Sequence, residues 1–178
     1  MTAVQIRLAA DDEYERIDEF IRSAYEHDYG PREHGDDPMR LARNRAQAYD
    51  VWVAVDAEKG EILGSVTTAS AGGSPLMEDA GPEDLTFRLL AVAPQARRRG
   101  LGAALTRHVI ELARERGIPR VFLKSAPQMT GAHALYLATG FHRDPERDGL
   151  WIDGRKVLEL HAFLVDIDTI PSLQENHA

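Results

Sequence analysis

A strand, a long amphipathic helix and a second strand follow one another near the middle of the chain, and this order most constrains the fold. Leu85–Val92 is an almost wholly apolar run, as expected of a buried strand. Hydrophobic residues recur at helical spacing from Arg99 to Arg116, and Gly117 follows where a left-handed residue ends many helices. Val121–Leu123 is again apolar. Because a crossover helix returns the chain in the same direction, the two strands are predicted to pair in parallel.

Further strands and helices are predicted on both sides of this β-α-β unit. The order of elements indicates a mixed sheet flanked by helices. In chain order, the patterns predict a strand at 4–8, a helix from 14 to about 29, a second helix at 37–49, a hairpin of strands at 51–55 and 62–68, a flexible surface loop at 70–82, a short helix at 131–139, and two last strands, one around 141–143 or 151 and one at 157–165.

The length of 178 residues leaves room for one domain, which we place at 1–165, followed by a polar tail at 166–178 that is expected to fray. A chain of this size buries enough surface to fold without disulfides or metals. It contains no cysteine, which removes thiolate nucleophiles and Cys-ligated metal sites from the candidate chemistries. The histidines show no metal-binding spacing, so no metal is expected.

The net charge of −8 argues against nucleic acid as a partner, because affinity for a phosphate backbone comes mainly from Lys and Arg. No run approaches the 18 or more apolar residues of a membrane span, and the first ten residues lack the pattern of a secretion signal. We therefore expect a cytoplasmic protein without a membrane partner.

Two glycines open the central helix directly after three arginines, in the run Arg97-Arg98-Arg99-Gly100-Leu101-Gly102-Ala103. Each glycine costs about 1 kcal/mol inside a helix relative to alanine, so local propensity does not explain the pair. A helix N-terminus presents unpaired N–H groups, and glycine lets a phosphate approach them closely. The run therefore indicates an anion cradle for a phosphorylated cofactor; the alternative is an ordinary tight turn beside solvated arginines.

Other phosphate-binding motifs fit less well. A dinucleotide fingerprint requires a third glycine where this chain has Leu105, and the Gly-Lys-Ser/Thr ending of a P-loop is absent. A basic nucleic-acid signal is weakened by the shortness of the arginine run and by the acidic remainder.

The segment Leu89–Pro94, followed by Arg97-x-x-Gly-x-Gly, resembles the acyl-CoA-binding motif of the GNAT N-acetyltransferases. Ala132–Phe141 is similar to the later Ala-x-x-x-Tyr-x-x-x-Gly-Phe segment of that family. Two ordered motifs are more specific than either alone, and the resemblance covers roughly 4–165.

The resemblance implies an α/β (α+β) fold: a mostly antiparallel sheet of six or seven strands with a splayed parallel pair, flanked by about four helices. Acetyl-CoA would lie across the splayed strands, its pantetheine arm on the main chain of Leu90 and Val92 and its diphosphate on amides of the glycine-bearing turn. Met129 stands where many relatives carry an Asn that contacts cofactor or substrate. The cofactor-binding residues implied are Leu90, Ala91, Val92, Arg97, Arg98, Arg99, Gly100, Leu101, Gly102, Ala103, Met129 and Ala132.

The family's tyrosine maps onto Tyr136, which the resemblance makes the general acid for the departing CoA thiolate. Because Tyr136 lies on the apolar face of its helix, the alternative is a core tyrosine.

The attacking amine must also lose a proton. Many relatives use a Glu for this, at a position occupied here by Thr86. Of the carboxylates nearby, Glu83 and Asp84 are the first candidates for the base, against the alternative of solvated loop carboxylates. Glu26, Asp28 and His133 are further candidates.

These features predict an acyl-CoA-dependent N-acetyltransferase that moves an acetyl group from acetyl-CoA to a primary amine by direct attack in a ternary complex. The acidic composition favours a cationic acceptor. Two alternatives stay open: a non-catalytic acyl-CoA sensor, which Thr86 allows, and a dinucleotide-binding oxidoreductase, which Leu105 disfavours. The resemblance also leaves a homodimer open.

Overall fold

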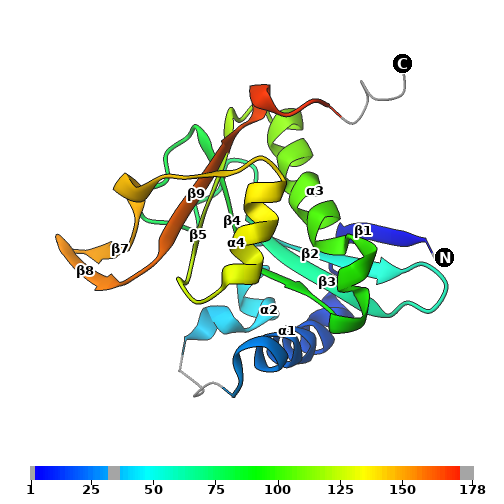
Figure 1. The fold of residues 1–178 in the computed structure, drawn as a ribbon. Coiled ribbons are helices and arrows are strands. Elements are labelled where there is room, and N and C mark those ends of the chain that lie inside the picture. Colours follow the sequence, from blue (N-terminus) through cyan, green and yellow to red (C-terminus); the bar gives the residue numbers. More distant parts are fainter. Residues whose placement is uncertain (1–2, 32–36, 173–178) are drawn as a thin grey trace. The chain divides into compact units, whose positions relative to one another are not determined.

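A computed structural model describes residues 3–31 and 37–172 of the chain (Figure 1). The chain forms two compact units. The first consists of Met1–Ser74 and Leu89–Leu105, and the second of Pro75–Arg88 and Thr106–Ala178. Strand β4 (Asp84–Val92) and helix α3 (Leu101–Glu115) each contribute residues to both units.

The first unit is built on an antiparallel meander. Strand β1 (Val4–Leu8) pairs with β2 (Tyr49–Asp56), and β2 pairs with β3 (Ile62–Ala69). Helix α1 (Tyr14–Tyr29) lies along these strands (Figure 1) and ends at Gly30. The core of this unit combines side chains from α1, from the short helix α2 (Ala42–Arg45) and from the central strands: Ile17, Ala42, Val51, Val53, Val55 and Ile62.

The predicted helix at 37–49 is wrong in extent. The structure has a 3-10 turn at Pro38–Arg40, the single-turn helix α2 at Ala42–Arg45, and then β2. Leu41 is extended between the two pieces. The guanidinium of the buried Arg45 donates to the main-chain oxygens of Met39 and Arg40, at 3.0 and 2.7 Å. Tertiary hydrogen bonds therefore take carbonyls that a continuous helix would have used.

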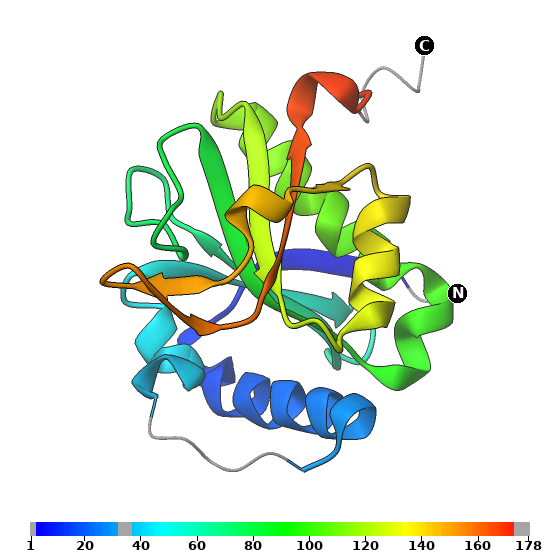
Figure 2. The same ribbon diagram turned by 60° about the vertical axis from the view of Figure 1, so that its left-hand side comes forward.

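The second unit contains the parallel pair. Asp84–Thr86 of β4 pairs in parallel with Arg120–Phe122 of β5 (Arg120–Ser125). β5 pairs antiparallel with β9 (His161–Asp166), which also pairs with β6 (His142–Arg143). Figure 2 shows β9 running beside β5. The strand order β1-β2-β3-β4-β5-β9-β6 confirms the predicted mixed, mostly antiparallel sheet, and of the six or seven strands expected it has seven.

The predicted last strand at 157–165 is two strands. Strand β8 (Arg155–Leu158) pairs with β7 (Leu150–Ile152) in a separate hairpin, whereas β9 belongs to the large sheet. The apolar residues continue through both strands, so the sequence does not show where one ends. The two strands differ in burial: β9 is buried, whereas Val157 and Leu158 of β8 are about half exposed. The start of the predicted frayed tail is also ordered: Ile167–Thr169 forms a 3-10 turn and Ile167 is buried. The remainder, 173–178, lies outside the described residues.

The loop between β3 and β4 contains no helix or strand, as predicted, but it is held in place where it enters the second unit. Met77 is buried against Phe122, Ala162 and Leu164. The main-chain N–H of Leu76 donates to Thr86 Oγ1 at 2.9 Å.

Helix α3 approaches β3 closely at Gly64. A Cβ at this position would lie 2.7 Å from Leu105 Cδ1 and 3.3 Å from the main-chain oxygen of Ala91. Only glycine lets the first turns of α3 pack this near to the strand. This packing fixes the N-terminus of α3 within the first unit.

Within residues 3–31 and 37–172, no helix is both long and apolar enough to cross a membrane.

Candidate functional site

The arginine–glycine run forms a turn that leads into α3. Pro94–Arg99 is a 3-10 helix, and Gly100 follows in the left-handed conformation with a φ of 72°. The helix then begins at Leu101, and the Ala104 N–H donates to the Gly100 oxygen at 3.0 Å. Leu101 is buried and anchors the first turn. The turn thus places the positive end of the helix dipole next to Arg98 and Arg99, both exposed. This arrangement suits a bound anion.

Arg97 is bound to the end of α1. Its Nη1 and Nη2 atoms donate to the two carboxylate oxygens of Asp28, at 2.5 and 2.7 Å, and Nη2 also lies 3.4 Å from the Val92 oxygen. The hydrogen bond from Arg97 is the main cause that lowers the pKa of Asp28 below its usual value. The ion pair therefore engages Asp28, one of the carboxylates considered as a base, and it ties α1 to the cradle.

The end of β4 departs from regular strand geometry. Leu89 has a φ of 56°, a left-handed conformation that is rare for a branched side chain. This interruption lies three residues beyond Thr86, the last residue paired with β5. The hydroxyl of Tyr25 lies 3.4 Å from the Leu90 oxygen, and the Ala93 N–H donates to the Leu63 oxygen of β3 at 2.8 Å. The parallel pairing of β4 with β5 thus ends at Thr86, before the stretch predicted to bind the pantetheine arm.

Tyr136 lies in the second unit, on helix α4 (Thr130–Ala138), and is 5% exposed. Its ring packs against Phe87, Phe141 and Phe163 at centroid distances of 5.9, 5.8 and 5.6 Å. The aromatic cluster holds the ring in one orientation. Such fixing serves a core tyrosine and equally a proton donor, which must be held in place.

Ser125, Met129 and His133 meet where β5 ends and α4 begins. His133 Nε2 is 3.1 Å from Ser125 Oγ, and Ser125 Oγ is 3.8 Å from the sulfur of Met129. The His133 ring also packs on His161 and Phe163. Burial, more than the nearby His161, lowers the pKa of His133. Ala132, on the same helix, is half-buried.

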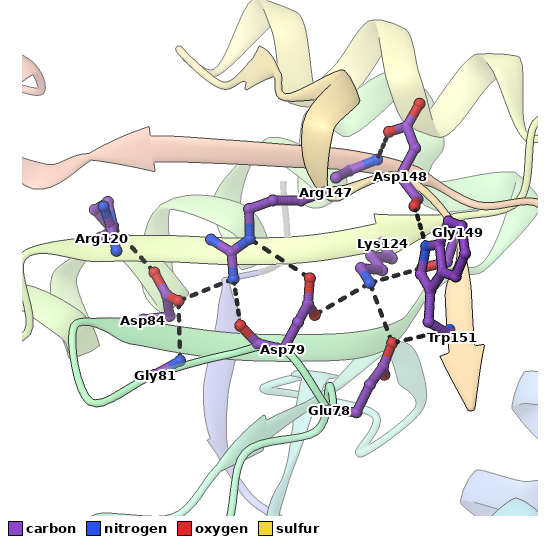
Figure 3. A network of polar contacts seen from close by, with 11 residues as sticks. Glu78, Asp79, Gly81, Asp84, Arg120, Lys124, Arg147, Asp148, Gly149 and Trp151 are labelled. Carbon is purple, nitrogen blue, oxygen red and sulfur yellow. Dashed lines mark hydrogen bonds and ion pairs between the residues drawn. The ribbon is translucent and has the colours of Figure 1, made fainter. Parts of the chain in front are cut away.

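Asp84 begins β4, Glu83 precedes it, and both take part in ion pairs. Figure 3 shows the network around Asp84. Asp84 is 2% exposed in its side chain and accepts from Arg120 Nε at 3.0 Å and from Arg147 Nη2 at 3.1 Å. Glu83 is 67% exposed in its side chain and pairs with Arg120 at 3.2 Å. These contacts hold Asp84 in the network; Asp84 opens β4 and Glu83 precedes it, whereas the predicted cofactor residues of this strand are its last three, Leu90–Val92.

The same network holds the loop before β4. The ammonium of Lys124, 2% exposed in its side chain, pairs with Glu78 at 3.3 Å and Asp79 at 3.1 Å (Figure 3). Arg147 stacks over the ring of Phe122, 3.5 Å from its centroid. Among the described residues there is no group of three side chains that could hold a metal ion.

In the structure, the predicted site residues therefore form three separate groups. Residues 90–92 and 97–103 come together in the first unit, whereas Ala132 and Tyr136 lie on α4 in the second unit and Met129 directly precedes that helix. Glu83 and Asp84 stand apart from both groups along the chain. Sequence reasoning missed Ser125, because a lone serine at the end of a strand belongs to no motif; His133 was named only as one of several candidates.

Comparison with known proteins places these features in one family. A model of the acetyltransferase (GNAT) family matches residues 14–141. N-acetyltransferase 8 of Mus musculus is 30% identical over 119 residues, which are 67% of this chain and 46% of that protein. The chain thus matches about half of this relative's length.

Solved structures share the fold. A GNAT-family acetyltransferase from Staphylococcus aureus Mu50 superposes with a TM-score of 0.73 at 17% identity, covering 93% of this chain and 99% of the other. A spermidine N-acetyltransferase from Vibrio cholerae, in complex with CoA and spermine, has a TM-score of 0.64 at 16% identity, covering 93% and 96% of the two chains.

Proposed function

Because this chain belongs to the GNAT acetyltransferase family, we propose that it transfers an acetyl group from acetyl-CoA to a primary amine. The observation that carries the proposal is the cradle: a left-handed Gly100, a glycine in the first turn of α3, and three arginines before them. Main-chain N–H groups at such a turn suit the diphosphate of CoA. The main chain of a strand end that is no longer paired with β5 suits the amide-bearing pantetheine arm.

The reaction proceeds by direct attack of the amine on the thioester carbonyl. This chain contains no cysteine, so an acetyl-cysteine intermediate is not available to it. Negative charge that develops on the carbonyl oxygen would be stabilised by a main-chain N–H near Val92. Tyr136 would protonate the departing thiolate: a phenol with a pKa of about 10 can supply a proton to a thiolate of about 8.5 in an organised site.

The acceptor proposed is a cationic amine, because the chain carries a net charge of −8. The relative from Vibrio cholerae, which holds spermine, makes polyamines a suitable first class to test.

The second candidate function is an acyl-CoA sensor without catalysis. It is favoured by Thr86, which is buried and whose Oγ1 accepts the Leu76 N–H instead of facing a substrate.

Release of free CoA thiol from acetyl-CoA should separate the two functions. We expect thiol release that depends on the amine, measured over polyamines, aminoglycosides and peptides with free amines, with matched alcohols as controls. Acetyl-CoA at 100 times its dissociation constant should also stabilise the protein by about 2.7 kcal/mol in thermal unfolding. Stabilisation without turnover on any amine would favour the sensor. If acetyl-CoA gives no stabilisation and no amine gives turnover, both functions are excluded.

Replacement of Tyr136 by phenylalanine should lower kcat by about 100-fold, the lower range for loss of a general acid. The dissociation constant for acetyl-CoA should change less than about twofold, because Phe keeps the ring that packs on Phe87, Phe141 and Phe163. Fixed-time assays of CoA release measure kcat, and isothermal titration calorimetry measures the dissociation constant for acetyl-CoA. Tyr14→Phe, on α1, serves as the matched control and should leave kcat unchanged. An unaltered kcat in Tyr136→Phe would leave this tyrosine a packing residue.

A further inference from the structure

The proposed reaction needs a group that takes a proton from the amine, and the carboxylates first considered for that role are engaged elsewhere. Asp84 is buried between Arg120 and Arg147, and Asp28 is paired with Arg97. An ammonium group has no lone pair, so no attack occurs until the proton has left. A neutral base within the second unit would meet this need.

Ser125 and His133 have the geometry of such a base. Ser125 is the last residue of β5 and is 7% exposed, and His133 lies in the first turns of α4. The Oγ–Nε2 distance of 3.1 Å is that of a hydrogen bond. A hydroxyl next to an imidazole that a third group orients is the arrangement by which proteins move protons at a reacting atom.

The third group is the main chain of Ala126. A hydrogen bond between His133 and the main chain of Ala126 raises the pKa of His133 and so opposes the effect of burial. In the neutral ring only one nitrogen carries a proton. In the relay that we infer, this proton lies on Nδ1, so that Nε2 accepts the hydroxyl proton of Ser125 across the 3.1 Å contact.

Burial in the first place, and then the charged groups around His133, favour the neutral form of the ring. His161, opposite Ser125 on β9, has its ring centroid 5.4 Å away, and Arg143 on β6 stacks over Phe163, which the His133 ring also contacts. Burial, His161 and Arg143 all lower the pKa of His133. Asp148 pairs with Arg143 and interacts with His161, so it brings a carboxylate into this group.

The pair also lies beside the proposed acid. Tyr136 follows His133 by one turn of α4, and both rings pack against Phe163, at 5.6 and 4.9 Å. Residues three apart on a helix share a face. The base and the acid would therefore be held by one helix and one aromatic partner.

We propose that Ser125 and His133 form a proton relay that deprotonates the acceptor amine, a proposal that rests on the acetyltransferase function. The amine gives its proton to Ser125 Oγ as the hydroxyl proton moves to His133 Nε2. The neutral amine then attacks, so that the C–N bond forms and the C–S bond breaks. The thiolate takes the proton of Tyr136, and the surplus proton on the amide nitrogen restores the phenol. His133 finally releases its proton to water, which balances the reaction.

The test is the pH profile of kcat for His133→Gln, which retains a hydrogen-bonding side chain but does not titrate. In the wild type, kcat should fall with decreasing pH as His133 becomes protonated, below the ordinary imidazole pKa of about 6.5. In His133→Gln, kcat should drop by about 100-fold and lose this acidic limb, while affinity for acetyl-CoA stays within about twofold. His142→Gln, an exposed histidine on β6, is the matched control and should behave as the wild type.

Two further variants keep the proposal testable if the glutamine variant folds poorly. Ser125→Ala should lower kcat by a similar factor, whereas Ser125→Thr, which retains the hydroxyl, should recover most of it. Added imidazole should restore part of the activity of His133→Ala. A wild-type acidic limb that persists in His133→Gln, with unchanged kcat, would overturn the relay and leave the acetyltransferase function intact. Absence of amine-dependent turnover in the wild type would overturn both.

Discussion

Replacement of Gly102 by glutamate should raise the dissociation constant for acetyl-CoA by at least about 100-fold, or about 2.7 kcal/mol. Gly102 is the second residue of α3, where the main-chain N–H groups of the cradle begin. A carboxylate there would take the place of the diphosphate and repel it. Each charge-assisted hydrogen bond lost contributes about 1.5–3 kcal/mol, so the expected effect corresponds to one or two such bonds.

The same substitution should leave the fold intact, which separates loss of binding from loss of structure. Glutamate has a higher helix propensity than glycine and is favourable in the first turn of a helix. Isothermal titration gives the affinity, and urea unfolding gives the stability. Gln5→Glu, an exposed position on β1, adds the same charge away from the cradle and should bind acetyl-CoA as the wild type does. Wild-type affinity in Gly102→Glu would refute the cradle.

The sequence was most informative where local chemistry decides the structure. Gly100 directly precedes α3 with a φ of 72°, and Gly117 follows its end with a φ of 67°. Both follow from the freedom of glycine to take left-handed conformations. The parallel pairing of β4 with β5 followed from the helix between them and was confirmed.

The sequence was least informative where distant side chains decide the structure. The predicted helix at 37–49 failed because Arg45 binds carbonyls at Met39 and Arg40 that a helix needs. The left-handed conformation of Leu89 has no signal in its residue type. For the candidate site, the cradle was visible as a motif. The pairing of His133 with Ser125 was not, because it depends on how α4 packs at the end of β5.

Replacement of Asp84 by alanine should lower the free energy of unfolding by about 3 kcal/mol or more. The Asp84 side chain is 2% exposed and joins Arg120, Arg147 and the Gly81 N–H (Figure 3). Removing one member of a buried ion-pair network leaves the remaining charges without a partner, which costs about 3–5 kcal/mol. Urea unfolding followed by circular dichroism measures the effect.

Glu83→Ala provides the matched control, since Glu83 is the preceding residue and shares the partner Arg120. Its side chain is 67% exposed, so its ion pair is screened by water and the variant should differ from the wild type by less than about 0.5 kcal/mol. The pair of variants also tests the chemistry first considered for these carboxylates. If Asp84→Asn or Glu83→Ala folds normally but loses the high-pH plateau of acetyl transfer, a carboxylate is the base. If Asp84→Ala and Glu83→Ala lower the free energy of unfolding by the same amount, the network contributes little to stability. A larger effect at Asp84 is expected only if burial removes its ion pairs from water.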